Sequence, residues 1–381
     1  MDIQMVDLRG QYLRIKDEID EAVQEVLDGA QFIRGPLVGE FECELAGHLG
    51  GKYALGVGNG TDALQIAMMA LGVAPGDEVI TTAFTFVATA EAAALLGAVP
   101  VFADIDPESF NIDPSAIEDL ITPRTRAIVP VHLFGQPADL DPIMEIADRH
   151  GLPVIEDNAQ GVGAAYKGRA TGYIGTMGTL SFFPSKNLGA YGDGGAITTN
   201  DEALYEAARK VANHGGTRKY HNEIVGVNSR LDTLQAAILL VKLRHLEAFS
   251  VARRAAADRY DELLADVEGV TIPHRVPESS HVFHQYTIRV SPDVPEGRDG
   301  LAAHLKSAGI PHAVYYPTAL HQLPVFKDGH AACRIGEMTH TETAAQEVIS
   351  LPMHTELTGA QQGRVVDAIA EFVQTGQEAG A

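Results

Sequence analysis

A lysine near the middle of the chain lies among residues that suit an amine nucleophile. Lys186 stands between a short aromatic run, Phe182-Phe183, and a glycine-rich stretch that ends at Gly195. Glycines let a backbone approach a ligand closely, and apolar neighbours remove water from an ammonium group and so lower its pKa. An amine with a lowered pKa can form a Schiff base with a carbonyl compound. A lysine beside glycines is more often an ordinary surface residue, so this interpretation needs a second group.

Asp157 supplies that second group. It ends a short apolar run, residues 152–157, which is typical of a buried parallel strand that delivers its last side chains to the carboxyl edge of a sheet. Taken alone, Asp157 is more often a helix N-cap after a strand. Paired with a desolvated lysine, it fits a pyridoxal 5′-phosphate (PLP) site, in which the carboxylate keeps the pyridine nitrogen protonated and the lysine holds the aldehyde.

Three further stretches carry groups that such a cofactor needs. Residues 58–62 lie between a predicted strand and a predicted helix, and free N–H groups at a helix N-terminus bind phosphate. Gly60 permits close approach there and Thr61 can donate, although an ordinary turn capped by the threonine or by Asp62 is the alternative. The hydroxyl of Ser181 can reach the same phosphate. Phe86 can stack on a planar ring, although core packing explains a phenylalanine more often.

Two other kinds of site are disfavoured. A dinucleotide-binding fingerprint begins at Gly56-Val57-Gly58, but its third glycine would fall at residue 61, which is a threonine. His281, His284, His312 and His321 show no ligand spacing on one helix face with an acid nearby. We therefore expect neither a nicotinamide cofactor nor a metal.

Strand-like and helix-like segments alternate in the first half of the chain, which predicts a mostly parallel sheet with helices on both faces. The predicted strands are residues 53–57, 78–81, 99–104, 127–133 and 153–157. The predicted helices are residues 1–30, 38–49, 88–96, 114–120 and 142–150, with another that opens within 58–62 and ends at 71.

The second half of the chain contains a long helical pattern from Leu231 to about Ala265. Before it, strands over 179–183 and 195–199 flank the lysine stretch as a hairpin-like return, and a helix is expected over 201–213. After it we expect strands over 268–274 and 281–290 and helices over 300–308 and 361–375. We place a boundary inside the long helix, which gives a large domain over residues 1–250 and a smaller C-terminal α+β domain over residues 251–381.

The totals exclude several classes of protein. With 28 Lys+Arg against 51 Asp+Glu, the net charge of −23 disfavours nucleic-acid binding. Two distant cysteines, Cys43 and Cys333, favour a reducing compartment. No signal peptide and no run of 18 apolar residues is present, so we expect a soluble cytoplasmic protein without a membrane role.

Five motifs that occur in order along the chain resemble the sugar-nucleotide aminotransferases of the DegT/StrS group. They are Gly60–Leu64, His132–Gln136, Glu156–Gln160, the lysine stretch and Val227–Ala237. The resemblance runs over essentially the whole chain. It implies an aspartate-aminotransferase-like α/β architecture (PLP fold type I), PLP as cofactor, and a homodimer whose active sites are shared between subunits.

The resemblance also implies roles for individual residues. Lys186 matches the Schiff-base lysine, Asp157 the pyridinium partner, and Gln160 the residue near the ring 3-hydroxyl. The remaining matches to cofactor-binding positions are Gly60, Thr61, Phe86 and Ser181, with Asn228 supplied to the phosphate by the partner subunit. Arg230, Tyr315 and Tyr316 match residues that contact the substrate.

Within this group, Gln160 and the run Asn228–Asp232 resemble members that aminate a 3-keto nucleotide sugar. The implied reaction moves an amino group from L-glutamate to a UDP- or dTDP-linked keto sugar, in amino-sugar biosynthesis for a surface polysaccharide or a glycosylated metabolite. Several 3-amino members carry His-Tyr-Pro where this chain has Tyr315-Tyr316-Pro317, so the C6 substituent stays open, as do the nucleotide and glutamine as donor. The alternatives are a 4-keto aminotransferase, a PLP-dependent sugar dehydratase (in which a histidine typically replaces the lysine) and a non-enzymatic PLP-binding regulator.

Overall fold

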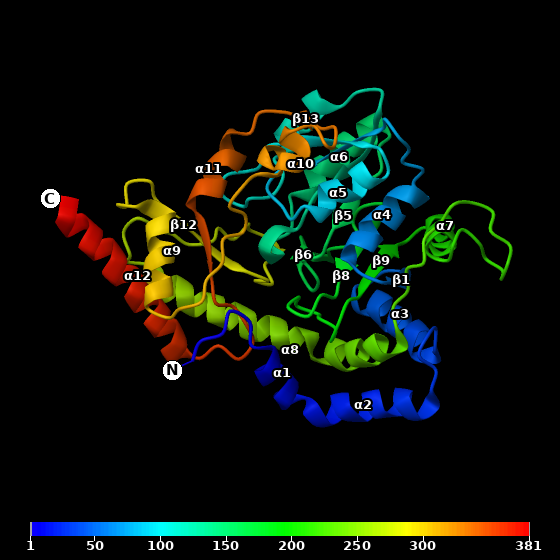
Figure 1. Ribbon diagram of the computed structural model, residues 1–381, viewed down its shortest axis with the longest axis horizontal. Helices are drawn as coiled ribbons and strands as arrows, with labels where there is room; N and C mark the ends of the chain where they lie inside the picture. Colours follow the sequence, from blue (N-terminus) through cyan, green and yellow to red (C-terminus); the bar gives the residue numbers. More distant parts are fainter. Residues whose placement is uncertain (1, 381) are drawn as a thin grey trace.

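A mixed β-sheet forms the centre of the molecule and helices cover it (Figure 1). The computed structural model describes residues 2–380, with the side chains of residues 2–375. One half of the sheet is parallel and runs in the order β13 (Arg334–Ile335), β3 (Val99–Ala103), β2 (Glu78–Thr82) and β4 (Thr125–Val129). The other half runs in the order β1 (Tyr53–Val57), β9 (Gly195–Thr199), β8 (Met177–Ser181) and β5 (Ile155–Asp157). Parallel bridges from Ile128 to Val154 and from Val131 to Asp157 join the halves.

Helices lie on both faces of this sheet because its strands are apolar on both faces. Val79 and Ile80 are neighbours in β2, so their side chains point to opposite faces, and they belong to two different hydrophobic clusters. The cluster around Val79 contains residues of α4 (Gly60–Ala70), α5 (Ala88–Leu95) and α7 (Glu202–Ala212). The cluster around Ile80 contains residues of α6 (Leu140–His150). The predicted α/β class is confirmed, with antiparallel pairing limited in this sheet to β9 and its neighbours β1 and β8.

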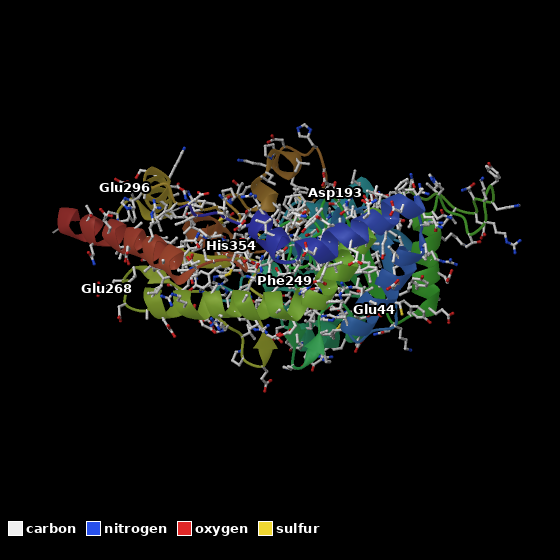
Figure 2. The ribbon with its side chains drawn as sticks, turned by 90° about the horizontal axis from the view of Figure 1, so that it is seen from below. Glu44, Asp193, Phe249, Glu268, Glu296 and His354 are labelled. Carbon is white, nitrogen blue, oxygen red and sulfur yellow. The ribbon has the colours of Figure 1, made fainter. Side chains whose placement is uncertain are left out.

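The long helix α8 (Thr233–Leu264) runs beneath the sheet, and the N-terminal helices lie along it (Figure 1). These are α1 (Leu8–Arg14), α2 (Lys16–Gly29) and α3 (Pro36–His48). Figure 2 shows Phe249 part-way along α8, where it is buried together with Ile15 and Ile19. The predicted single helix over residues 1–30 is wrong, because Ile15 leaves helical geometry (φ −119°, ψ 21°) between α1 and α2.

The C-terminal part of the chain builds a second layer with its own apolar core. Strands β10 (Val270–Thr271), β12 (Tyr286–Val290) and β14 (Val348–Leu351) form an antiparallel sheet, packed by α9 (Gly297–Ser307) and α12 (Gly359–Gly380). Between these elements the chain returns to the central sheet, where β13 pairs with β3 and is followed by α11 (Thr339–Glu347). Helix α8 is continuous through residue 250, and the division into residues 1–250 and 251–381 stays a prediction.

Local chemistry explains where the predicted elements are wrong. The predicted helix over 114–120 is two short 3₁₀ turns, Pro114–Ala116 and Glu118–Leu120. The predicted strand over 127–133 ends at Val129, because Pro130 follows and has no N–H to donate. The predicted strands over 268–274 and 281–290 shorten to β10 and β12. Within the described residues, no helix is both long and apolar enough to cross a membrane.

Candidate active site

A cavity of about 650 Å³ opens at the carboxyl edge of the central sheet. Thr85, Val131 and Asp157 line it, and they lie at or just after the ends of β2, β4 and β5. Open α/β sheets bind ligands at this edge. All predicted site residues except Asn228 and Arg230 line the cavity, namely Gly60, Thr61, Phe86, Asp157, Gln160, Ser181, Lys186, Tyr315 and Tyr316.

Asp157 is a buried carboxylate at the floor of the cavity. Burial raises its pKa, and two hydrogen bonds oppose that shift: Thr89 Oγ1 donates to Oδ2 at 2.8 Å and the Ala159 N–H donates to Oδ1 at 3.2 Å. The positive charge of Lys186 also lowers the Asp157 pKa. A second cation beside this carboxylate, such as a protonated ring nitrogen, favours its ionised form further.

Lys186 follows β8 in the glycine-rich segment and lies at the cavity wall. Its backbone N–H donates to the Phe183 carbonyl at 2.8 Å, which turns the segment towards the cavity. Burial lowers the pKa of the Lys186 ammonium to about 8, while the charge of Asp157 acts in the opposite direction. A far larger fraction of neutral amine is therefore present near neutral pH than for an ordinary lysine, as nucleophilic chemistry requires.

The N-terminus of α4 forms one corner of the cavity. Asn59 caps the helix by accepting from the Asp62 N–H at 2.8 Å, so the cap is neither Thr61 nor Asp62. The N–H groups of Gly60 and Thr61 have no acceptor in the described part of the chain and are free for a ligand. Ser181 lies so close that a Cβ added at Gly60 would be 2.7 Å from the Ser181 Cβ. Glycine is therefore required for the helix and the serine hydroxyl to share this corner.

The opposite wall is polar but uncharged. Gln160 accepts from the Phe134 N–H at 2.7 Å through Oε1 and donates through Nε2 to the Tyr316 hydroxyl at 3.2 Å. Burial raises the pKa values of Tyr315 and Tyr316, so both hydroxyls stay protonated. Phe86 is 58% exposed at the cavity, which excludes core packing as the reason for an aromatic side chain at this position.

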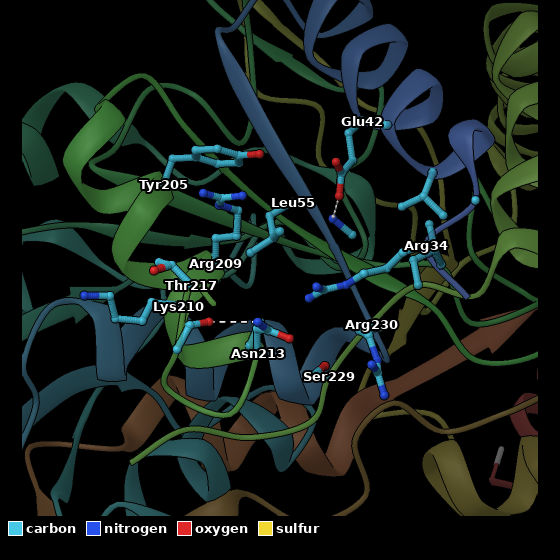
Figure 3. Close-up of a pocket in the computed structure, with 17 residues that line it drawn as sticks. Arg34, Glu42, Leu55, Tyr205, Arg209, Lys210, Asn213, Thr217, Ser229 and Arg230 are labelled. Carbon is cyan, nitrogen blue, oxygen red and sulfur yellow. Dashed lines mark hydrogen bonds between the residues drawn. The ribbon is translucent and has the colours of Figure 1, made fainter. Parts of the chain in front are cut away.

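Asn228 and Arg230 lie outside this cavity. Arg230 lines a neighbouring pocket of about 260 Å³ with Arg34 and Arg209 (Figure 3). Between them, the Ser229 hydroxyl accepts from the Gly58 N–H at 2.8 Å and donates to Asp62 Oδ2 at 2.6 Å, which ties this segment to the start of α4. Asn228 itself is exposed. Within one chain, the structure therefore does not bring Asn228 and Arg230 to Lys186.

Several residues of the site have weak signals in the sequence. Thr89, which holds Asp157, resembles any threonine in the first turn of a helix. Glu156, which precedes Asp157 in β5, pairs with His132: His132 Nδ1 accepts from the Ala138 N–H, so the imidazole proton is on Nε2 and is donated to Glu156 at 2.9 Å. Their motifs appear in the sequence, but only the fold shows this contact.

The cavity also contains His284, which sequence reasoning treated only as a rejected metal ligand. Its pKa is lowered well below the usual value, first by burial and then by the charges of Lys186 and Arg253, so the ring is neutral. No group of three or more His, Cys, Asp or Glu side chains in the described residues is arranged to hold a metal ion.

Comparison with known proteins decides the family. The model of the DegT/DnrJ/EryC1/StrS aminotransferase family matches residues 13–370. The chain belongs to this family. It is 51% identical to the UDP-2-acetamido-2-deoxy-3-oxo-D-glucuronate aminotransferase of Pseudomonas aeruginosa over 94% of this chain and 97% of the relative. It is 50% identical to a pleiotropic regulatory protein of Geobacillus stearothermophilus over 98% of this chain and 99% of the relative.

Solved structures of aminotransferases share the fold. DesV of S. venezuelae in complex with a ketimine intermediate has a TM-score of 0.93 and 40% identity, covering 98% of this chain and 99% of that one. NtdA of Bacillus subtilis with bound cofactor PMP has a TM-score of 0.86 and 36% identity, covering 94% of this chain and 82% of that one. The fold predicted from the resemblance is confirmed.

The donor set of this DegT/DnrJ/EryC1/StrS family member fits PLP. The free N–H groups of Gly60 and Thr61 and the hydroxyl of Ser181 offer donors for the phosphate, and a carboxylate and an amine with a lowered pKa line the same cavity. An aldehyde-bearing pyridine phosphate needs these three kinds of group. The observed residues thus match the cofactor of the family in chemistry as well as in sequence.

Proposed function

We propose that this chain is a PLP-dependent aminotransferase that moves the amino group of L-glutamate to the 3-keto group of a UDP- or dTDP-linked sugar. The observation that carries the proposal is the shared cavity of Lys186 and Asp157, an amine with a lowered pKa and a buried carboxylate beside a phosphate corner. The relative from Pseudomonas aeruginosa, whose name specifies a 3-oxo nucleotide sugar, supports the sugar position.

The site residues divide the work by their chemistry. PLP, when bound, supplies a ring that accepts electrons. Asp157 holds the positive charge on the ring nitrogen, and Thr89 orients the carboxylate. Lys186 would be the general base that takes the proton from the Cα of glutamate and then the acid that delivers it to C4′ of the cofactor. An amine with a pKa of about 8 can do both near neutral pH.

We propose further that two copies of the chain complete each site. The diphosphate of a nucleotide sugar needs cations. Among the described residues that line the main cavity, Lys186 is the only lysine or arginine, and Asp62, Asp157 and Asp193 line the same cavity. Arg34 and Arg230 line the neighbouring pocket, and neither guanidinium group forms an ion pair with another described residue. Ile33 precedes Arg34, and Val225 lies a short way before Arg230 in the chain. Both side chains are apolar and exposed, which supports burial of this surface by a second copy.

Glutamate and a panel of keto sugars test the proposed reaction. Glutamate should bleach the visible absorbance of the PLP-loaded protein, and a 3-keto UDP- or dTDP-sugar should restore it, with ping-pong kinetics. NMR of the product should place the new amine on C3. An amine on C4 would establish the 4-keto alternative, and loss of a ring hydroxyl without amine transfer would establish the dehydratase.

A regulator that only binds PLP is a second candidate, because one relative is described as a pleiotropic regulatory protein. The same experiment separates the two functions. A regulator would keep its absorbance band in the presence of glutamate and would release no 2-oxoglutarate.

A further inference from the structure

Lys242 is an amine buried beneath the segment that carries Lys186, and burial together with the charge of Arg253 lowers its pKa to about 7. It lies in the first half of α8, its side chain is 0% exposed, and no carboxylate of the described residues forms an ion pair with it. Its Nζ donates to the Gly189 carbonyl at 2.5 Å and lies 5.2 Å from the centre of the Tyr191 ring. A buried amine is costly without such partners, and a carbonyl together with an aromatic face can compensate for part of the lost hydration.

Both partners of Lys242 belong to the segment that carries Lys186. This segment folds closely on itself: a Cβ added at Gly189 would lie 2.3 Å from the Pro184 carbonyl oxygen. A second residue of α8, Gln235, accepts from the Tyr191 N–H at 2.8 Å. The helix therefore holds the segment at two points on the side away from the cavity.

We propose that Lys242 is a positioning residue, which fixes the segment between Pro184 and Tyr191 on α8 and so sets the direction of the Lys186 side chain. A methionine of similar length would fill the same space without the cost of burying an amine. The amine is thus explained by its contacts with Gly189 and Tyr191 and not by packing. This inference rests on the proposed role of Lys186.

The decisive variant is Lys242→Met in the PLP-loaded protein. Since methionine fills the space and needs no hydration, we expect an unchanged or higher melting temperature. Since Lys186 is then held less firmly, we expect kcat to fall by about 10- to 100-fold with KM for glutamate changed little. The midpoint of the visible PLP band in a pH titration should also move. Arg244→Met, on the exposed face of the same helix, is the matched control and should change none of these values.

Two results would overturn the proposal. One is a Lys242→Met protein with the wild-type pH titration and the wild-type kcat. The other is a Lys242→Met protein whose lower kcat is fully explained by a smaller folded fraction at the assay temperature. If that variant does not fold, Tyr191→Leu replaces it. Because Tyr191 is 37% exposed, loss of its ring leaves no cavity in the core. An unchanged PLP titration in Tyr191→Leu then counts against the proposal. Absence of any visible band in the wild-type protein with PLP would instead refute the proposed function itself.

Discussion

Two groups of the main cavity, to which we assign the chemistry, have pKa values that shift because the fold removes water from them. Burial lowers the pKa of Lys186 and raises that of Asp157, and each opposes part of the other's shift through its charge. Residue types and order were enough to predict this pair, since a carboxylate at a strand end and a lysine among glycines converge at one sheet edge. The support from Thr89 could not be predicted, because it depends on how α5 packs against β5.

The pKa of Lys186 predicts how fast the PLP-free protein captures its cofactor. The protonated amine is unreactive, so the association rate with PLP should rise with pH through about 8 and then level off. Stopped-flow absorbance measures this rate. A midpoint near the ordinary lysine value of 10.5 would show that the amine is not desolvated.

Thr89→Val removes one of the hydrogen bonds to Asp157 and keeps the shape of the side chain. The loss should raise the Asp157 pKa further, so the acid limb of the pH–activity profile should move to higher pH. The free energy of unfolding should fall by about 1–3 kcal/mol, since a buried acceptor loses its donor. Thr343→Val, at an exposed position of α11, is the control. Identical acid limbs in the two variants would contradict the role given to Thr89.

At the scale of elements, the strands around the cavity were predictable because each contains a short apolar run, although the strand predicted to end at residue 133 ends at Val129. The conformations of the turns between them were less predictable. Phe86 shows the same limit, because a phenylalanine after a strand looks like a core residue and only the fold exposes it. Asn59 is a further example: its side chain caps α4 and thereby leaves the next two N–H groups free.

The corner between α4 and Ser181 predicts the effect of a single methyl group. Gly60→Ala places a Cβ against the Ser181 Cβ, so the helix must shift and a phosphate contact is weakened. The affinity for PLP should fall by about tenfold, as expected for one lost hydrogen bond. Gly47→Ala in α3, where an added Cβ meets nothing within 4 Å, should leave the affinity unchanged. Equal PLP affinity in both variants would remove α4 from the phosphate site.

At the scale of the whole molecule, one chain brings most of the predicted site residues to one cavity, whereas Arg230 lines a neighbouring pocket. The sequence resemblance implied that Asn228 serves the partner subunit and that Arg230 contacts the substrate. Both residues lie outside the cavity of their own chain, which agrees with a site that one chain does not complete. Composition could not show this, because the net charge of −23 hides the local group of arginines around Arg34.

Two inactive variants test the shared site. Lys186→Ala and Arg230→Ala chains, produced together in equal amounts, should regain about a quarter of the wild-type activity, since half of the dimers are mixed and each mixed dimer has one intact site. Each variant alone should be inactive and dimeric by light scattering. No activity in the mixed preparation would mean that Arg230 acts within its own chain, and normal activity of Arg230→Ala alone would mean that Arg230 does not act.

The most direct test of the central claim is to reduce the PLP-loaded protein with borohydride and to map the modified peptide by mass spectrometry. Reduction makes the bond between a lysine and PLP permanent, so the account predicts one phosphopyridoxyl group per chain, on Lys186. A label on another lysine, or no covalent label in a protein that binds PLP, would contradict it.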